Sequence, residues 1–202
     1  MYPEEAKKNL TDNLGQESLL SCNAINKLLV YKCVCGKDTT SLRNKYSGLN
    51  IYSVQAWNPT LSQYEDRLKY TYNDFGNISS VTSDGEIYTS YLWSYYNQYP
   101  VLKVENASID KVLSALNKDR AWLIHFEKSG QPDIFALSGT NLPHTTYTYR
   151  PLIGVSSIRG ADGVDTYFQY DYWGRLIRSY ILEDGVEKTI STFTYNTPGY
   201  HL

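Results

Sequence analysis

The sequence predicts a mainly β protein, an antiparallel meander of long hairpins with an N-terminal helix and a short helical insertion. It contains 20 tyrosines among 202 residues, and Tyr favours strands because its ring covers neighbours while its hydroxyl reaches water. Asp-Gly pairs, which are typical of two-residue hairpin turns because both positions need positive φ, separate strand-like segments. These pairs are Asp84-Gly85, Asp162-Gly163 and Asp184-Gly185.

We expect the N-terminal segment, residues 1–21, to be helical. Pro3 suits the first position of a helix, and Glu4 and Glu5 suit the positive end of its dipole. Apolar residues then recur every four positions up to Leu14, and Gly15 ends the pattern.

Residues 22–105 are predicted to form β hairpins, because they contain the β-branched and aromatic runs LLVYKCVC (28–35), YSVQAW (52–57) and EIYTSYLW (86–93). Residues 106–145 are predicted to be a helical insertion. Ser108 is a good N-cap, and the apolar residues that follow it, from Ile109 to Leu116, have the spacing of a core-facing helix. Hairpins resume over 146–202, and we expect the whole chain, 1–202, to be one domain.

A short unit, aromatic-x-Tyr-polar, repeats along the chain. It reads YTYN at 70–73, YTYR at 147–150, FQYD at 168–171 and FTYN at 193–196, and YTYNDFGNI (70–78) aligns without a gap with FQYDYWGRL (168–176). Each unit predicts a strand, a tight turn begun by Asn or Asp and completed by Gly, and a returning strand. The signature residues are Tyr70, Tyr72, Gly76, Tyr147, Tyr149, Tyr170, Asp171, Gly174, Arg175 and Leu176.

The run YDYWGRL resembles the signature of the YD-repeat family, which includes the Rhs proteins and the teneurin ectodomains. SYLWSYYNQYPVLKVENAS (90–108) and the segment 145–176 are also similar to the terminal repeat region of YD-repeat proteins of Bacteroides-like bacteria. The resemblance implies antiparallel strands that wind as a β strip, which in large members closes into a hollow shell on the cell surface or in a secreted protein. With few repeats and no signal peptide at its start, this chain is expected to be a scaffold or shell fragment of such a larger protein.

Charge and motifs argue against several other classes of function. The formal net charge is −2, so no basic field exists to attract nucleic acid, and no apolar run is long enough to span a membrane. The three His residues form no HExxH motif, and the Asp and Glu residues at turns are expected to cap backbone donors. We therefore predict no catalytic residue, no metal and no cofactor.

The aromatic residues that crowd the window 88–99 are the remaining candidates for a binding site, above all Tyr91, Trp93, Tyr95 and Tyr96. Such side chains either cover cross-strand neighbours and fill the core, or form a surface that stacks on sugar rings or anchors a protein. The leading expectation is a non-catalytic structural or interaction module with a protein or glycan partner. The alternatives are a carbohydrate-binding module and a hydrolase directed at glycans or the cell wall.

Overall fold

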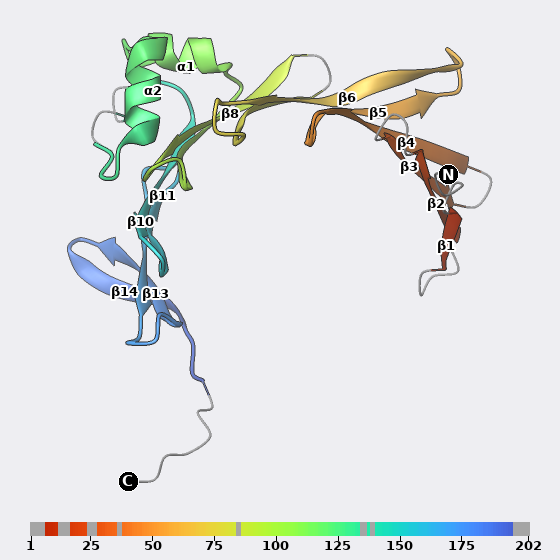
Figure 1. Cartoon of the computed structure of the whole chain (residues 1–202). Helices are drawn as coiled ribbons and strands as arrows, with labels where there is room; N and C mark the ends of the chain where they lie inside the picture. Colours follow the sequence, from red (N-terminus) through yellow and green to blue (C-terminus); the bar gives the residue numbers. More distant parts are fainter. Residues whose placement is uncertain are drawn as a thin grey trace. The chain divides into compact units, whose positions relative to one another are not determined.

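A computed structural model describes residues 7–11, 17–23, 28–35, 38–83, 86–133, 137 and 140–195, with side chains from residue 41 onward. It is mainly β, and the strands form an open antiparallel meander in which the order of the strands is the order of the chain (Figure 1). The strands are β1 Lys7–Thr11, β2 Glu17–Asn23, β3 Leu28–Cys35, β4 Asp38–Ser47, β5 Asn50–Asn58, β6 Gln63–Tyr72, β7 Ile78–Ser83, β8 Ile87–Ser94, β9 Tyr99–Glu105, β10 His144–Arg150, β11 Gly154–Arg159, β12 Asp165–Tyr170, β13 Leu176–Glu183 and β14 Val186–Thr192.

The chain divides into two compact units, Met1–Thr89 and Ser90–Leu202. The first unit holds β1 to β7, in which each strand pairs antiparallel with the next. The second holds β9 to β14, paired in the same way, and both helices. Strand β8 contains the boundary between the units.

The predicted N-terminal helix is not confirmed. Within residues 1–21, Lys7–Thr11 form β1 and pair with β2, with Leu10 opposite Ser18, and the rest of the predicted helix before Glu17 lies outside the described residues. Pairing with a neighbouring strand satisfies the backbone groups of this segment and overrides its helix propensity, which is a weak preference.

The helical insertion is confirmed as α1 Ile109–Ala115 and α2 Arg120–Lys128. Ser108 caps α1 by accepting a hydrogen bond from Lys111 N at 3.3 Å, and Asp119 caps α2 by accepting one from Trp122 N at 2.7 Å. Asn117 has a positive φ of 54° just after α1, as is common where a helix ends.

The buried apolar side chains of the described residues all belong to the second unit, where α1 and α2 cover one face of the strands (Figure 1). On β8 the side chains alternate, so that Ser90, Leu92 and Ser94 are buried beneath the helices while Tyr91 and Trp93 are half-buried. The core consists of Leu92, Val101, Leu102, Val104, Ala107, Ile109, Val112, Leu113, Leu116, Leu123, Phe126 and Leu137.

In the first unit, the described part of the sheet buries polar side chains instead. Ser53 Oγ and Gln55 Nε2 each donate to Asp66 Oδ1 at 2.5 Å, and Arg43 Nε donates to Gln55 Oε1 at 2.6 Å. Burial raises the pKa of Asp66, but the hydrogen bonds from Ser53, Gln55 and Lys69 outweigh it, so this carboxyl has a pKa below its ordinary value. Hydrogen bonds across β4, β5 and β6 therefore hold this part of the sheet together.

We expect Leu102→Ala to lower the free energy of unfolding of the second unit by about 2–5 kcal/mol, because it removes a fully buried side chain and leaves a cavity. Leu182→Ala, in the half-exposed Leu of β13 in the same unit, is the matched control. Denaturant unfolding followed by hydrogen exchange of the second unit would measure both. Equal effects for the two variants would contradict the placement of the core.

Candidate functional site

The first repeat turn joins β6 to β7 and is built around Asn73. Its backbone N–H donates to Asn77 O at 2.9 Å, and its carbonyl accepts from Gly76 N at 3.0 Å. Its side-chain Oδ1 accepts from the backbone N–H groups of Phe75 and Asn77. Gly76 has a φ of 83°, which only glycine adopts without strain.

The second repeat turn, between β12 and β13, reproduces this geometry around Asp171. Its N–H donates to Arg175 O at 2.9 Å, its carbonyl accepts from Gly174 N at 3.1 Å, and its Oδ1 accepts from Trp173 N and Arg175 N. The guanidinium of Arg175 adds an ion pair with Asp171 at 2.7 Å. Desolvation raises the pKa of Asp171, but these hydrogen bonds and the charge of Arg175 outweigh it and lower the pKa.

The Tyr at the third position of each repeat unit holds the start of the preceding strand. In every copy its hydroxyl donates to the carbonyl of a residue at or next to the start of that strand, and we call this hydrogen bond the tyrosine clamp. The clamps are Tyr72 to Ile51 at 2.6 Å, Tyr149 to Pro100 at 2.8 Å, Tyr170 to Val155 at 2.8 Å and Tyr195 to Leu176 at 2.8 Å.

A bulge at the clamp position is shared by three of the four copies. The register shifts by one residue just before Tyr72, Tyr149 and Tyr170, and the same shift occurs before Tyr46 in β4. Tyr46 was not predicted as a repeat residue, because NKYS at 44–47 has Asn44 where the other copies have their first aromatic. The turn glycine Gly48, with a φ of 62°, was the available signal.

The middle residue of two copies makes a second contact that sequence analysis missed. Thr71 Oγ1 lies 2.9 Å from Ser79 Oγ and 2.7 Å from Ser80 Oγ. Thr148 Oγ1 lies equally close to the serine pair of β11, at 2.8 and 2.6 Å. The sequence contains a signal for this pairing. The strings ISS (78–80) and VSS (155–157) each begin eight residues after the first Tyr of a YTY string.

Two of the Asp-Gly pairs lie in chain reversals. Asp184 and Gly185, with φ of 52° and 78°, join β13 to β14, as the two-residue hairpin turn requires. Gly163, with a φ of 79°, closes the turn between β11 and β12, in which Asp162 Oδ1 accepts from Val164 N. Asp84-Gly85 lies outside the described residues.

The candidate aromatic residues have different surroundings. The phenols of Tyr91 and Tyr147 lie near Lys103, whose pKa is raised first by its hydrogen bond to Glu105 and further by these two phenols. Trp93 is half-buried on the same strand as Tyr91.

Tyr95 belongs to a different group, a cluster of rings with Tyr99 and Tyr149. The Tyr99 and Tyr149 rings stack with centroids 4.6 Å apart, and Tyr95 meets both edge-on. Burial raises the pKa of Tyr149 to about 12, with smaller contributions from neighbouring phenols. The Tyr95 and Tyr149 rings pack against the core, and the cluster joins β9, β10 and the turn before β9.

The turn between β8 and β9 is strained and attached to the end of α2. Tyr95, Tyr96 and Asn97 have φ of 52°, 57° and 62°, a left-handed run that costs roughly 1–2 kcal/mol per residue. Tyr96 N donates to Ser129 O at 2.9 Å, and the backbone and side-chain N–H groups of Asn97 both donate to Glu127 O at 3.0 Å. The turn thereby satisfies carbonyls that the end of a helix leaves without partners.

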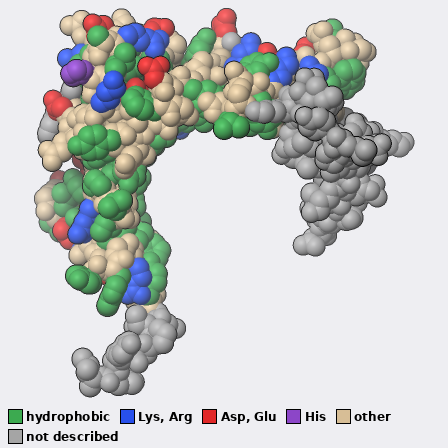
Figure 2. Space-filling view, viewed as in Figure 1, with side chains coloured by type: hydrophobic (Ala, Val, Ile, Leu, Met, Phe, Trp, Pro, Cys, Tyr) green, Lys and Arg blue, Asp and Glu red, His purple; other side chains and the backbone are tan. Residues whose placement is uncertain are grey.

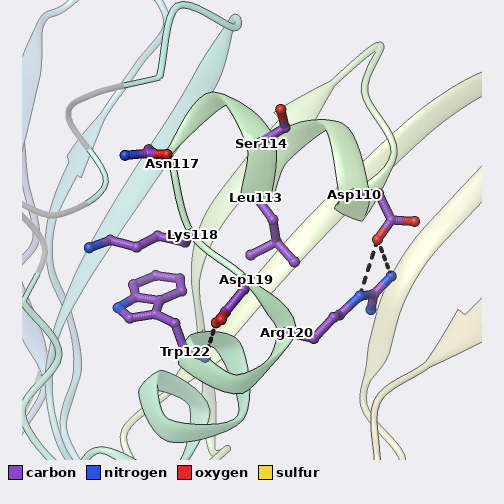
Figure 3. Close-up of a pocket in the computed structure, with 8 residues that line it drawn as sticks. All are labelled: Asp110, Leu113, Ser114, Asn117, Lys118, Asp119, Arg120 and Trp122. Atoms are coloured by element: carbon purple, nitrogen blue, oxygen red, sulfur yellow. Dashed lines mark hydrogen bonds and ion pairs between the residues drawn. The ribbon is translucent and has the colours of Figure 1, made fainter.

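A shallow open groove of about 810 Å³ lies between α1 and α2 (Figure 3). Asp110 and Arg120 form an ion pair at one side of it, and Asn117, Lys118 and Trp122 project to the other side. The Lys118 ammonium lies 5.6 Å from the centre of the Trp122 ring. The Trp122 ring also stacks on the ring of Phe126. The groove combines one aromatic ring with charges of both signs.

No model of a known protein family matches the sequence, and no curated protein matches it. In the part of the chain that the structure describes, no group of three or more His, Cys, Asp or Glu side chains could hold a metal ion. No helix among the described residues is long and apolar enough to cross a membrane.

We expect Asp171→Asn to flatten the acid limb of the pH–stability profile. Because the folded-state pKa of Asp171 is lowered from 3.8, its contribution is present above that value and is lost as pH falls through the folded pKa. Asparagine keeps the turn, as Asn73 does in the first copy, but loses the ion pair with Arg175. Thermal unfolding between pH 2 and 7 would show the difference, and identical profiles would contradict it.

Proposed function

We propose that this chain is a non-catalytic structural module of the YD-repeat type, a β strip that serves as a scaffold or shell fragment in a larger Rhs-like surface or secreted protein. The observation that carries the proposal is the tyrosine clamp, which recurs in both units with the same donor and the same kind of acceptor. A bond that recurs with the repeat serves the architecture that the copies share, whereas a catalytic constellation is ordinarily built once.

The clamp suits a strip that is extended by adding hairpins. Each hydroxyl reaches back to the start of the preceding strand, so every hairpin is fixed to the one before it by a side chain as well as by the sheet hydrogen bonds. Repeat proteins in which each unit contacts only its neighbours gain stability unit by unit. Such a module would offer its edges and faces as binding surfaces. The partner expected from the sequence is a protein or a glycan.

Removing three clamp hydroxyls tests this role. We expect Tyr72→Phe, Tyr149→Phe and Tyr170→Phe together to lower the free energies of unfolding of the two units by about 1.5–4.5 kcal/mol in sum, since each change deletes a hydrogen bond worth about 0.5–1.5 kcal/mol. The hairpins should also become sensitive to limited proteolysis.

The control is Tyr52→Phe, Tyr96→Phe and Tyr172→Phe, which alters three exposed tyrosines. If the scaffold depends on the clamps, the control variant should keep the stability and protease resistance of the unmodified chain, and the clamp variant should lose both. Equal stability and equal protease resistance of the two variants would remove the basis of the proposal, and so would turnover of a glycan or cell-wall substrate by the unmodified chain.

The groove between α1 and α2 favours carbohydrate binding as a second candidate function. Sugar-binding sites combine an aromatic platform with polar groups, and the groove offers the half-exposed Trp122 together with Ser114 and Asn117. Its charges, from Asp110, Asp119, Lys118 and Arg120, cancel, which suits a neutral ligand.

A glycan array measures this second function directly. We expect Trp122→Ala to reduce any retained signal at least about tenfold, the loss of roughly 1.4 kcal/mol of stacking. Trp57→Ala, in the partly exposed Trp of β5, is the control. Absence of any signal from the unmodified chain would remove the carbohydrate function and leave the scaffold unaffected.

A further inference from the structure

Three turns of the second unit lie along one edge of its meander: residues 95–98, 151–153 and 171–175. Alternate turns of a meander fall on the same edge, and contacts show that these three are neighbours. Leu152 N donates to Tyr99 Oη at 3.2 Å, which connects the first turn to the second. A Cβ placed on Gly174 would lie 3.8 Å from Ile153, which connects the second turn to the third.

Each of these turns carries a large apolar or aromatic side chain at its tip. Tyr96 is 72% exposed, Leu152 94%, Tyr172 94% and Trp173 71%. We call these four residues the apolar edge, and Figure 2 shows hydrophobic side chains at the surface of the second unit. Turn positions normally carry Gly, Pro, Asn, Asp or Ser, as the opposite edge does at Asp162-Gly163 and Asp184-Gly185.

Charge differs between the two edges as well. Lys128 lies between Glu127 and Ser129, whose carbonyls accept hydrogen bonds from the first turn. Arg150 directly precedes the second turn. In the described part of the chain neither cation is in an ion pair, whereas the acidic Asp171 of the third turn is neutralised by Arg175. The opposite edge carries Asp162 and Asp184 instead.

We propose that the apolar edge docks on an anionic lipid surface. Its side chains lie on three separate turn tips, with Tyr172 and Trp173 in an edge-on pair on the third, so they suit insertion into a fluid interface better than burial against a flat protein surface. Tyr and Trp favour the boundary between water and lipid, and anionic headgroups attract the flanking Lys128 and Arg150. Docking of this kind is peripheral and requires no membrane span.

Co-sedimentation of the full chain with vesicles tests the proposal. We expect binding to vesicles of phosphatidylcholine with about 30% phosphatidylserine, and weaker binding to phosphatidylcholine alone or in high salt. Leu152→Ser with Tyr172→Ser should reduce the partition coefficient at least about tenfold. These two side chains are almost fully exposed, so the thermal unfolding of the second unit should stay unchanged.

Val164→Ser with Val186→Ser, at exposed apolar positions beside the turns of the opposite edge, is the matched control and should bind like the unmodified chain. Lys128→Gln with Arg150→Gln should abolish the preference for phosphatidylserine.

No sedimentation at about 1 mM lipid, roughly ten times the dissociation constant of a single acyl anchor, would overturn the proposal. Equal losses in the apolar-edge and control variants would also overturn it. So would self-association, seen by analytical ultracentrifugation, that Leu152→Ser with Tyr172→Ser removes while vesicles stay unbound, since the edge would then bind a second copy. None of these outcomes affects the clamp variants, so the scaffold proposal is tested separately.

Discussion

The hydrogen bond from a tyrosine hydroxyl to a backbone carbonyl of the preceding strand is the interaction on which the repeat depends. It explains why the second aromatic of each unit is Tyr in every copy, while the first is Tyr in two copies and Phe in the other two. Phenylalanine would cover the neighbouring strand equally well, but it could not donate to the carbonyl. The bulge before the clamp residue gives the chain the extra residue that lets the strand end and the turn begin.

Asn73 and Asp171 show how one turn tolerates two chemistries. Both side chains accept from the same two backbone donors, so either one preserves the turn. Only the aspartate adds an ion pair, and its partner Arg175 also lies over the rings of Trp173 and Tyr195. The second copy therefore has the same backbone turn as the first, with additional side-chain contacts.

The sequence predicted the β class, the helical insertion and the repeat turns, because these follow from local signals such as Ser108 as a cap and the Gly in each turn. It did not predict β1, since Lys7–Thr11 depend on pairing with β2 and their local pattern resembles a helix. It did not show how Tyr95 and Tyr96 differ: in the left-handed turn Tyr95 lies in a ring cluster and Tyr96 is exposed. The groove beside Trp122 depends on how two helices pack, which residue spacing alone does not show.

The two units are stabilised internally by different interactions. The second unit has a buried apolar core beneath the helices. The described part of the first unit has hydrogen bonds among a side-chain amide, a hydroxyl and a carboxylate. Hydrocarbon burial weakens on cooling, while polar contacts follow acidity and ionic strength more closely. Heat, cold and acid should therefore not act on both units alike. A single melting temperature would describe this molecule poorly, since one half can loosen while the other keeps its shape.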